Sequence, residues 1–261
     1  MSDDAELFLP DPEAGRMFTT SRIVRTTDVT ATGRLRLDGI ARYLQEAAED
    51  DVLDAGWDEA QDWLLRRCVV TLRGYPVHGN RVRLRTFCSA LGPRWAERTT
   101  TLSGDNSDVI QASAVWVAVA RQTGAPALLG PEFHRVYGES AQGRKVSARL
   151  FHSGPDPSLD GRPWPLRACD FDPAGHVNNT IAWAAAEDVL AGVDWLPARA
   201  EIEYYQPILP GCEPWLLADH SPARHDSPAR HDSPGRHDSP ARTGMWLMAG
   251  QDRLASGRLF A

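Results

Sequence analysis

Residues 28–35 read DVTATGRL, and residues 170–177 read DFDPAGHV. Aligned without a gap, the two stretches share their opening Asp and their Gly, and each is followed by a sequence with helical periodicity. A motif that recurs together with the element after it is typical of a duplicated structural unit. The two stretches therefore predict a chain that contains the same unit twice.

The first unit is predicted to hold one helix and a sheet. Apolar residues spaced by three and four predict a helix over about residues 37–55, with Asp38 as a cap at its start and Gly56 as its end. One strand is expected before the helix, within residues 18–28. Four more are expected after it, at residues 68–73, 81–88, 95–102 and 109–120, the last two flanking the turn sequence GDN at 104–106. This order predicts an α+β unit with a curled antiparallel sheet.

The second unit repeats that order. A helix is predicted over residues 181–190, ending before Gly192, and strands are predicted at residues 200–205, 215–218, 245–249 and 253–260. We therefore divide the chain into a flexible leader (1–17), an N-terminal domain (18–137), a linker rich in Gly, Pro and Ser (138–165) and a C-terminal domain (166–261).

A hexapeptide repeat interrupts the second unit. Residues 221–242 consist of the repeats SPARHD, SPARHD and SPGRHD followed by SPAR, and the first unit has only a short turn at the corresponding place, residues 90–94. We interpret the tract as a disordered expansion of a hairpin loop, since longer loops add little closure entropy. The alternative is a metal or phosphate binder, because His225, His231 and His237 recur every six residues.

Composition excludes several classes of protein. The chain has 261 residues and a formal net charge of −7, which argues against a general nucleic-acid binder. No window approaches the roughly 18 uncharged apolar residues of a membrane span, and the acidic N-terminus lacks the pattern of a secretion signal, so we expect a cytoplasmic protein. Four cysteines without C-x-x-C spacing indicate neither a zinc cluster nor a disulfide framework.

The densest group of polar residues, DFDPAGHVNN at residues 170–179, lies at the start of the second predicted helix. Asp172 and His176 place a carboxylate and an imidazole close together, which is enough to activate a water or orient a nucleophile. Gly175 allows close approach of the backbone, and amides at a helix start can stabilise a developing oxyanion. These residues predict hydrolysis of an activated acyl group. The alternative is that they form caps and turns, with His176 a half-buried structural residue.

A cysteine nucleophile is a second chemical alternative. Cys169 adjoins Asp170, and Cys212 follows the turn at Gly211, so a Cys–His thioesterase is conceivable. Nothing in the neighbouring sequence indicates a lowered thiol pKa, and we favour the carboxylate.

The run D-x-D-x-x-G-H-V-N-N followed by a helix resembles the active-site segment of hot-dog thioesterases. The two-copy arrangement is similar to the acyl-acyl carrier protein (acyl-ACP) thioesterase family, and so are several short segments: Gly33-Arg34-Leu35, Leu44-Gln45-Glu46-Ala47-Ala48, residues 63–67, Tyr75-Pro76, Trp116-Val117 and Thr123-Gly124. The resemblance implies two tandem hot-dog domains, each a curved antiparallel sheet wrapped around a long helix. It also implies a hydrolase that releases fatty acid from acyl-ACP in fatty acid biosynthesis, with no metal and no organic cofactor.

The resemblance places the catalytic groups in the second copy. Asp172 is expected to be the general base or nucleophile, and His176 to orient the substrate carbonyl or the Asp. Donors to the oxyanion are expected among the backbone amides of Gly175, Val177, Asn178 and Asn179. The first copy has Thr30 and Arg34 at the matching positions, which cannot do acid–base work at neutral pH, so it is expected to be a scaffold that shapes the acyl pocket.

The sequence departs from the family at two positions. Plant members carry an Asn and a Glu where, by our alignment, this chain has Ala174 and about Pro207, and neither replacement can relay a proton. Single-domain acyl thioesterases that resemble this motif act without that Glu. Glu187, on the second predicted helix, and Glu203, on the next strand, are reserve candidates for the catalytic carboxylate. The alternative is that both are ordinary surface or strand residues, since only their proximity in sequence to the motif points to them.

The partner implied by the resemblance is the acidic acyl carrier protein. Because this chain is itself net negative, docking is expected to need local arginines, and the candidates are Arg66, Arg67, Arg73 and Arg199. Three alternatives stay open: an acyl-CoA thioesterase, a catalytically weakened hot-dog protein that binds acyl groups, and a hot-dog hydratase. The sequence also leaves open whether two chains pair as a homodimer.

Overall fold

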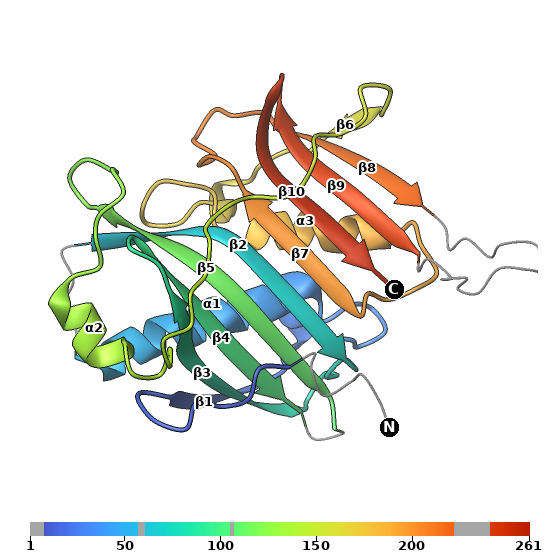
Figure 1. Cartoon of the computed structure of the whole chain (residues 1–261). Helices are drawn as coiled ribbons and strands as arrows, with labels where there is room; N and C mark the ends of the chain where they lie inside the picture. Colours follow the sequence, from blue (N-terminus) through green and yellow to red (C-terminus); the bar gives the residue numbers. More distant parts are fainter. Residues whose placement is uncertain (1–7, 57–60, 105–106, 222–240) are drawn as a thin grey trace, which may run out of the picture.

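In the part of the chain that the structure describes, one antiparallel sheet of ten strands is the dominant element. The structure, a computed structural model, describes residues 8–56, 61–104, 107–221 and 241–261. The strand order is β1-β3-β4-β5-β2-β7-β10-β9-β8-β6, and the sheet curves around two helices, α1 and α3 (Figure 1). Within the described residues, no helix is both long and apolar enough to cross a bilayer.

The first half of the chain supplies the elements β1 (Phe18–Ile23), α1 (Leu37–Asp54), β2 (Gln61–Arg73), β3 (Arg81–Leu91), β4 (Trp95–Ser103), β5 (Val109–Ala120) and α2 (Pro131–Tyr137). The second half supplies β6 (Gly161–Pro163), α3 (Thr180–Leu190), β7 (Arg199–Tyr204), β8 (Trp215–Ser221), β9 (Arg242–Ala249) and β10 (Asp252–Phe260). A short 3₁₀ turn precedes each long helix, at Thr26–Asp28 and Ala168–Asp170.

The two halves meet where β2 pairs with β7. This ladder is antiparallel, with Arg67 opposite Glu203 at one end and Thr71 opposite Arg199 at the other. Counted outward from this joint, the two halves place their strands in the same succession. The repeated order of elements expected from the sequence is therefore present in the strand order of the sheet.

The main core lies between the helices and one face of the sheet. Alternating residues of β2 and β7, such as Val70 and Ile202, are fully buried there against apolar residues of α1 and α3 such as Ile40 and Ala185. One continuous cluster includes residues of both halves. Because burial of a large aliphatic side chain contributes roughly 1.5–3 kcal/mol, this shared core ties the halves together.

The strands and both long helices expected from the sequence are confirmed, with shifted boundaries. The strand β2 begins at Gln61, earlier than the expected residue 68, and pairs along its whole length with β5. In the sequence of its first part, polar and apolar residues do not alternate: Trp63, Leu64 and Leu65 are consecutive apolar residues, and the register shifts between Leu65 and Arg67. The helix α2 and the strand β6 were not predicted from the sequence.

The expected cap of the first helix is wrong, and its expected end is right. Asp38 lies in the first turn of α1 and pairs with Arg36, its Oδ1 at 2.8 Å from Nε. The first amide of α1, that of Leu37, instead donates to Glu187 of α3 at 2.9 Å. Gly56 adopts a left-handed φ of 61° just after α1, as a helix-ending glycine does.

Residues before Phe18 contact the body of the protein. The amide of Leu9 donates to the side chain of Gln111 at 2.6 Å, and Arg16 pairs with Asp51 of α1 at 2.7 Å. Contacts therefore begin before the expected start of order near Phe18. Residues 1–7 of the expected leader lie outside the described residues.

The hexapeptide repeat connects two strands that pair with each other. β8 and β9 form an antiparallel hairpin, with Ser221 opposite Arg242 at its open end. This agrees with the expected position of the tract within a hairpin. Residues 222–240, on which the expectation of disorder falls, lie outside the described residues.

The linker crosses the face of the sheet that is turned away from α1 and α3 (Figure 1). Its residue His152 is buried, with Nδ1 at 3.0 Å from the hydroxyl of Ser256 and Nε2 at 3.1 Å from the carboxylate of Glu201. Arg253 donates to the carbonyl of His152 at 2.8 Å. The linker is therefore fixed to β7 and β10 by a buried polar cluster.

Candidate active site

The loops that precede α1 and α3 have the same backbone geometry. The amide of Thr30 donates to the carbonyl of Arg34 at 2.8 Å, and the amide of Asp172 donates to that of His176 at 2.9 Å. The glycines between them, Gly33 and Gly175, have φ values of 85° and 79°, which strongly favour glycine. The shared pattern confirms the alignment of residues 28–35 with residues 170–177.

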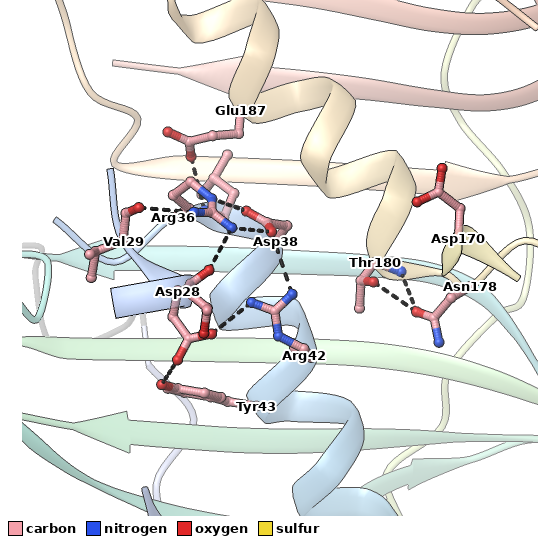
Figure 2. A network of polar contacts seen from close by, with 12 residues as sticks. Asp28, Val29, Arg36, Asp38, Arg42, Tyr43, Asp170, Asn178, Thr180 and Glu187 are labelled. Atoms are coloured by element: carbon pink, nitrogen blue, oxygen red, sulfur yellow. Dashed lines mark hydrogen bonds and ion pairs between the residues drawn. The ribbon is translucent and has the colours of Figure 1, made fainter. Parts of the chain in front are cut away.

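The Asp that opens each loop is structural. Asp170 is buried, and its Oδ2 accepts the amide of Arg167 at 2.7 Å. Asp28 accepts the amide of Arg25 at 3.2 Å in the same way, and also the hydroxyl of Tyr43 at 2.6 Å (Figure 2). These shared carboxylates hold the 3₁₀ turns closed and are not available for chemistry.

Asp172 has a carboxylate where its counterpart Thr30 has a hydroxyl. Its Oδ1 accepts the amides of Ala174 at 2.9 Å and His176 at 3.3 Å, which fixes the orientation of the carboxylate. The hydroxyl of Thr30 accepts the matching amide of Arg34, also at 3.3 Å. The Oδ2 of Asp172 accepts no hydrogen bond from the described residues, and Asp172 lines a cleft. One carboxylate oxygen is therefore held by the loop, and the other is available to a water or a substrate.

Three of the four amides expected to bind an oxyanion are used within the loop. Gly175 donates to the carbonyl of Asp172 at 3.0 Å, Val177 to that of Ile208 at 2.9 Å, and Asn178 to that of Asp170 at 2.8 Å. Their proposed role as oxyanion donors is therefore not supported by this geometry. The side chain of Asn178 caps α3, since its Oδ1 accepts the amide of Thr180 at 2.9 Å (Figure 2).

The fourth amide, that of Asn179, is not used within the loop. It donates to no acceptor among the described residues, and Asn179 lines the same cleft as Asp172. The carbonyl of Asn179 accepts the hydroxyl of Tyr204 at 2.9 Å, which anchors the start of α3 to β7. The Asn179 N–H is therefore not used by the described residues, and the dipole of a helix start favours an anionic ligand.

The cleft has a volume of about 570 Å³. Its wall comes mainly from the first half of the chain, and the second half adds Asp172 and Asn179. The apolar part of the wall consists of Ala48, Val52, Leu53, Trp63, Ala96, Trp116 and Phe133. A narrow space of about 30 Å³ adjoins it between α1 and the sheet, reaching Trp183. This arrangement agrees with the expectation that the first copy shapes an acyl pocket.

The polar groups of the cleft wall do not form a second reactive centre. Burial raises the pKa of the Cys88 thiol and of the Tyr137 phenol to about 12, so both stay neutral at physiological pH. Arg98 is paired with Asp51 of α1 at 2.6 Å, and Asp51 also binds Arg16. Among these wall residues, none is an activated nucleophile.

The structure does not join His176 to Asp172 through their side chains. His176 is half-buried and donates its backbone amide to Asp172, but its imidazole makes no hydrogen bond with the described residues. The counterpart of His176 in the first loop, Arg34, pairs with Glu187. The role of the His176 side chain stays a prediction.

Glu187, the first reserve carboxylate, has a structural role. Its Oε2 accepts the amide of Leu37 at 2.9 Å, and its Oε1 pairs with Arg34, which also stacks over Tyr75 with its guanidinium carbon 5.0 Å from the ring centre. In Figure 2, Glu187 points from α3 toward the start of α1. A carboxylate from one half thus caps the helix of the other half.

Glu203, the second reserve carboxylate, lies on the wrong face of the sheet. Residues alternate along β7, so Ile202 faces the helices and Glu203 faces the linker. Its carboxylate accepts the amides of Phe151 at 2.6 Å and His152 at 3.0 Å. It anchors the linker and cannot reach Asp172.

The cysteine alternative is weakened by the structure. Burial, together with the charge of Glu213, raises the pKa of the Cys212 thiol, which disfavours the thiolate. Cys169 is exposed, and its Sγ is 3.9 Å from Asp170, a structural carboxylate. Neither thiol lines the cleft.

The four candidate docking arginines do not gather at the cleft. Arg67, Arg73 and Arg199 lie on the face of the sheet opposite the helices, since the alternate residues Cys68, Val70, Leu72 and Ala200 are buried in the main core. Arg67 binds the carbonyl of Arg149 in the linker at 2.9 Å, and Arg199 pairs with Glu201 at 2.7 Å. Arg66 binds the carbonyl of Tyr204 at 3.0 Å. Three of the four therefore hold parts of the protein together.

The two positions where the sequence departs from the family lie in or beside the loop. Ala174 donates its amide to Asp172 at 2.9 Å. Pro207 precedes Ile208, whose carbonyl accepts the amide of Val177. The position of the missing Glu is therefore next to the loop, as the alignment indicates, but Pro207 brings no acid.

Sequence reasoning missed one polar residue of the site. Gln45, on α1, lines both the cleft and the narrow space beside it, together with Asn179. The alignment of the two copies contained the signal: continued without a gap into the helices, it carries Gln45 onto Glu187.

Comparison with known proteins agrees with this geometry. Residues 15–137 match the sequence model of a family described as "Acyl-ACP thioesterase N-terminal domain". Over 212 residues the chain is 32% identical to Rv2001, an uncharacterized protein of Mycobacterium tuberculosis, covering 80% of this chain and 85% of that protein.

Two solved structures share the fold. The 12:0-ACP thioesterase from Umbellularia californica aligns with a TM-score of 0.75 at 15% identity, over 94% of this chain and 93% of that one. An acyl-ACP thioesterase from Bacteroides thetaiotaomicron aligns with a TM-score of 0.71 at 17% identity, over 94% and 97%. At this identity the likeness extends to the fold, a mostly antiparallel sheet with few helices.

Proposed function

Because this chain belongs to the acyl-ACP thioesterase family, we propose that it hydrolyses the thioester of acyl-ACP and releases a free fatty acid for fatty acid biosynthesis. We also propose that the continuous sheet consists of two tandem hot-dog units, residues 18–137 and 166–261, with the active site in the second. The repeated strand order and the matching loops support this division. The carrier and the metabolic role go beyond the family's thioester chemistry and are part of the proposal.

One observation carries the proposal. A fixed carboxylate, that of Asp172, and a helix-start amide without a protein acceptor among the described residues, that of Asn179, lie on the wall of one apolar cleft. Hydrolysis of a thioester needs a base or nucleophile near the carbonyl carbon and a donor for the oxyanion. The adjoining apolar wall suits an acyl chain.

The proposed reaction proceeds by addition and elimination. Asp172 takes a proton from water, whose oxygen adds to the carbonyl carbon, or its carboxylate adds to that carbon directly. The amide of Asn179 stabilises the oxyanion of the tetrahedral intermediate. The C–S bond then breaks, and the thiolate of the carrier leaves and takes up a proton. In the direct route this step leaves an anhydride with Asp172, which water then hydrolyses to the free acid. His176 is proposed to orient the carbonyl from the same loop.

The proposal is tested with purified full-length protein and a series of acyl-ACPs of increasing chain length, with the matching acyl-CoAs in parallel. Thiol release and free acid are measured together. Release of both from acyl-ACP, at a higher kcat/KM than from acyl-CoA, is the expected result. Equal or better turnover of acyl-CoA would move the assignment to an acyl-CoA thioesterase.

Two further outcomes would overturn hydrolysis itself. Tight acyl binding without thiol release would indicate an acyl-binding protein. Addition of water to an enoyl substrate, with the thioester intact, would indicate a hydratase. Product analysis by mass separates these outcomes, because hydrolysis releases a free acid and a thiol, whereas hydration adds one water to an intact thioester.

The docking surface for the carrier is proposed to lie near the cleft. The placement of Arg67 and Arg199 on the opposite face of the sheet supports structural roles for them. Reversal of their charges is expected to affect acyl-ACP and a soluble thioester equally. A selective loss on acyl-ACP would restore them as docking residues.

A further inference from the structure

The two helices face each other's loops in a reciprocal way. The strands follow in the same succession on both sides of the β2–β7 pair, and the backbone hydrogen bonds of the loops before α1 and α3 match one another. In a two-fold arrangement, a contact from one unit to the other is matched by the reverse contact. The contact of Glu187 with the start of α1 therefore has a counterpart, which is Gln45 near the start of α3.

The contact made by Glu187 shows what the helix start binds. Its Oε2 accepts the amide of Leu37 at 2.9 Å, and the amide that matches Leu37 in the second loop is that of Asn179. A carboxylate oxygen on this amide stands in for the oxygen of a tetrahedral intermediate, since both are anionic acceptors at a helix start. The first site thus already contains an acceptor at the position of the proposed oxyanion.

Gln45 occupies the matching position at the second site without closing it. It lines the cleft and the narrow space beside it together with Asn179. Its Nε2 donates to Glu49 one turn further along α1, at 3.1 Å, in an exposed hydrogen bond that a ligand can replace. As an amide it carries two donor hydrogens and no charge, whereas Glu187 can only accept.

We propose that Gln45 is a substrate-positioning residue, which donates a hydrogen bond from Nε2 to the thioester carbonyl bound on the amide of Asn179. This rests on the proposed thioesterase function and adds a second donor, from the first half of the chain, to the oxyanion site. An acidic residue at this position would instead accept the Asn179 amide, as Glu187 accepts that of Leu37, and would exclude the oxyanion by charge. With Gln45 at the position that matches Glu187, the Asn179 amide stays without a protein acceptor among the described residues and can bind the substrate oxygen.

The test compares the variants Gln45→Ala and Gln45→Glu with the full-length wild type on the same acyl-ACP. Removal of one oxyanion donor typically lowers kcat by roughly 10²–10³-fold. We expect Gln45→Ala to lower kcat by about 10²-fold with a nearly unchanged KM and melting temperature. Gln45→Glu is expected to lose more activity than Gln45→Ala, because it adds an acceptor and a charge at the oxyanion site.

Two controls are matched to these variants. Glu46→Gln changes the next residue of α1, which pairs with Arg22 and does not line the cleft, and should keep kcat within about twofold. Glu187→Gln makes the reverse exchange at the first site and should lower stability while leaving kcat near that of the wild type.

The outcomes separate this inference from the proposed function. If the wild type hydrolyses acyl-ACP and Asp172→Asn does not, but Gln45→Ala and Gln45→Glu both keep normal kcat, the role of Gln45 is wrong and the thioesterase assignment stands. If the wild type releases no thiol from any thioester, the function fails. A fall in kcat that is accompanied by an equal loss of folded protein would also overturn the positioning role.

Discussion

The starts of α1 and α3 share one backbone geometry, and three of the positions at which their side chains differ decide what each start can bind. The first has Thr30 and Arg34 in its loop and receives Glu187 from the opposite helix, whose carboxylate binds both the Arg34 guanidinium and the Leu37 amide. The second has Asp172 and His176 and faces Gln45. The first start is closed by protein groups, and the second opens on the cleft.

The difference shows how a duplicated site can separate stability from chemistry. A charged cap on a helix start satisfies a backbone donor and is favoured by the helix dipole. A helix start that must bind an oxyanion cannot hold such a cap, so its donor stays without a protein acceptor until substrate arrives. Proteins commonly lose some stability at functional sites for this reason.

The largest effect is expected from Asp172→Asn. The amide oxygen of Asn can still accept the amides of Ala174 and His176, so the loop should keep its geometry while the base or nucleophile is lost. Turnover of acyl-ACP should fall by roughly 10²-fold or more, with acyl binding retained. Thiol release and ligand binding on the folded variant measure both.

The control is Thr30→Ala at the matching position of the first loop, which should be nearly silent in turnover. His176→Ala should also lower turnover if its ring orients the carbonyl. A fully active Asp172→Asn enzyme, or an inactive Thr30→Ala enzyme, would break the comparison between the two helix starts.

The next largest effect is on stability and concerns the closed helix start. Glu187→Gln leaves Arg34, whose side chain is only 14% exposed, without its charged partner. The free energy of unfolding should fall by about 2–3 kcal/mol, in the range of a charged hydrogen bond in a partly buried site. Urea denaturation measures it, and Gln45→Ala should change it by less than about 0.5 kcal/mol.

Acid sensitivity is expected to come in part from Glu201 in the linker anchor. Burial by itself raises the pKa of Glu201, but its hydrogen bonds with His152 and Arg199 outweigh burial and lower that pKa to about 2. Because the unfolded value is about 4.3, the stabilisation is complete above that pH and is lost as the pH falls toward 2.

The size of this effect should be on the order of 3 kcal/mol between neutral pH and about pH 2. Glu201→Gln should lower stability at pH 7 and flatten its dependence on pH below 5, as measured by urea denaturation over a pH series. An unchanged pH profile in this variant would show that the acid-sensitive group lies elsewhere, at the helix starts or on another strand.

The smallest effect concerns the hairpins of the two halves. β3 and β4 are joined by the short turn at residues 92–94, whereas β8 and β9 are joined by the hexapeptide tract. Replacement of residues 222–240 by a short turn should change stability by less than about 1 kcal/mol and leave turnover intact, because loop length adds little closure entropy. Loss of folding, or a metal-dependent loss of activity, would instead favour a binding role for the tract.

Local pattern was enough to predict most elements. Each strand and each long helix buries one face, so its apolar residues recur with a period of two or at a spacing of three and four. This period can be seen in the sequence of the element alone. The helix α2 was not predicted because its seven residues make only about two turns, in which Phe133 and Tyr137 are the two buried residues and both line the cleft. The early start of β2 was not predicted because the alternation of polar and apolar residues is interrupted near Leu65, where the register shifts.

The site was predicted only as far as the loop. Asp172 and Asn179 were expected from residues 170–179, but the fate of each amide depends on carbonyls distant in sequence, such as that of Ile208. Glu187 was a reserve carboxylate because it is close to the loop along the chain, whereas its partner, the Leu37 amide, is 150 positions away. Glu203 was expected on a strand and lies on β7, but the sequence did not show which face of that strand it occupies, and on the face observed it binds the linker.

The most direct test of the difference between the two helix starts is a crystal structure of the Asp172→Asn protein with an acyl thioester bound. The carbonyl oxygen should lie about 2.7–3.1 Å from the amide nitrogen of Asn179, with the acyl chain in the cleft and the Arg34–Glu187 pair intact at the start of α1. A thioester bound at the start of α1, or a carbonyl out of reach of the Asn179 amide, would contradict the assignment.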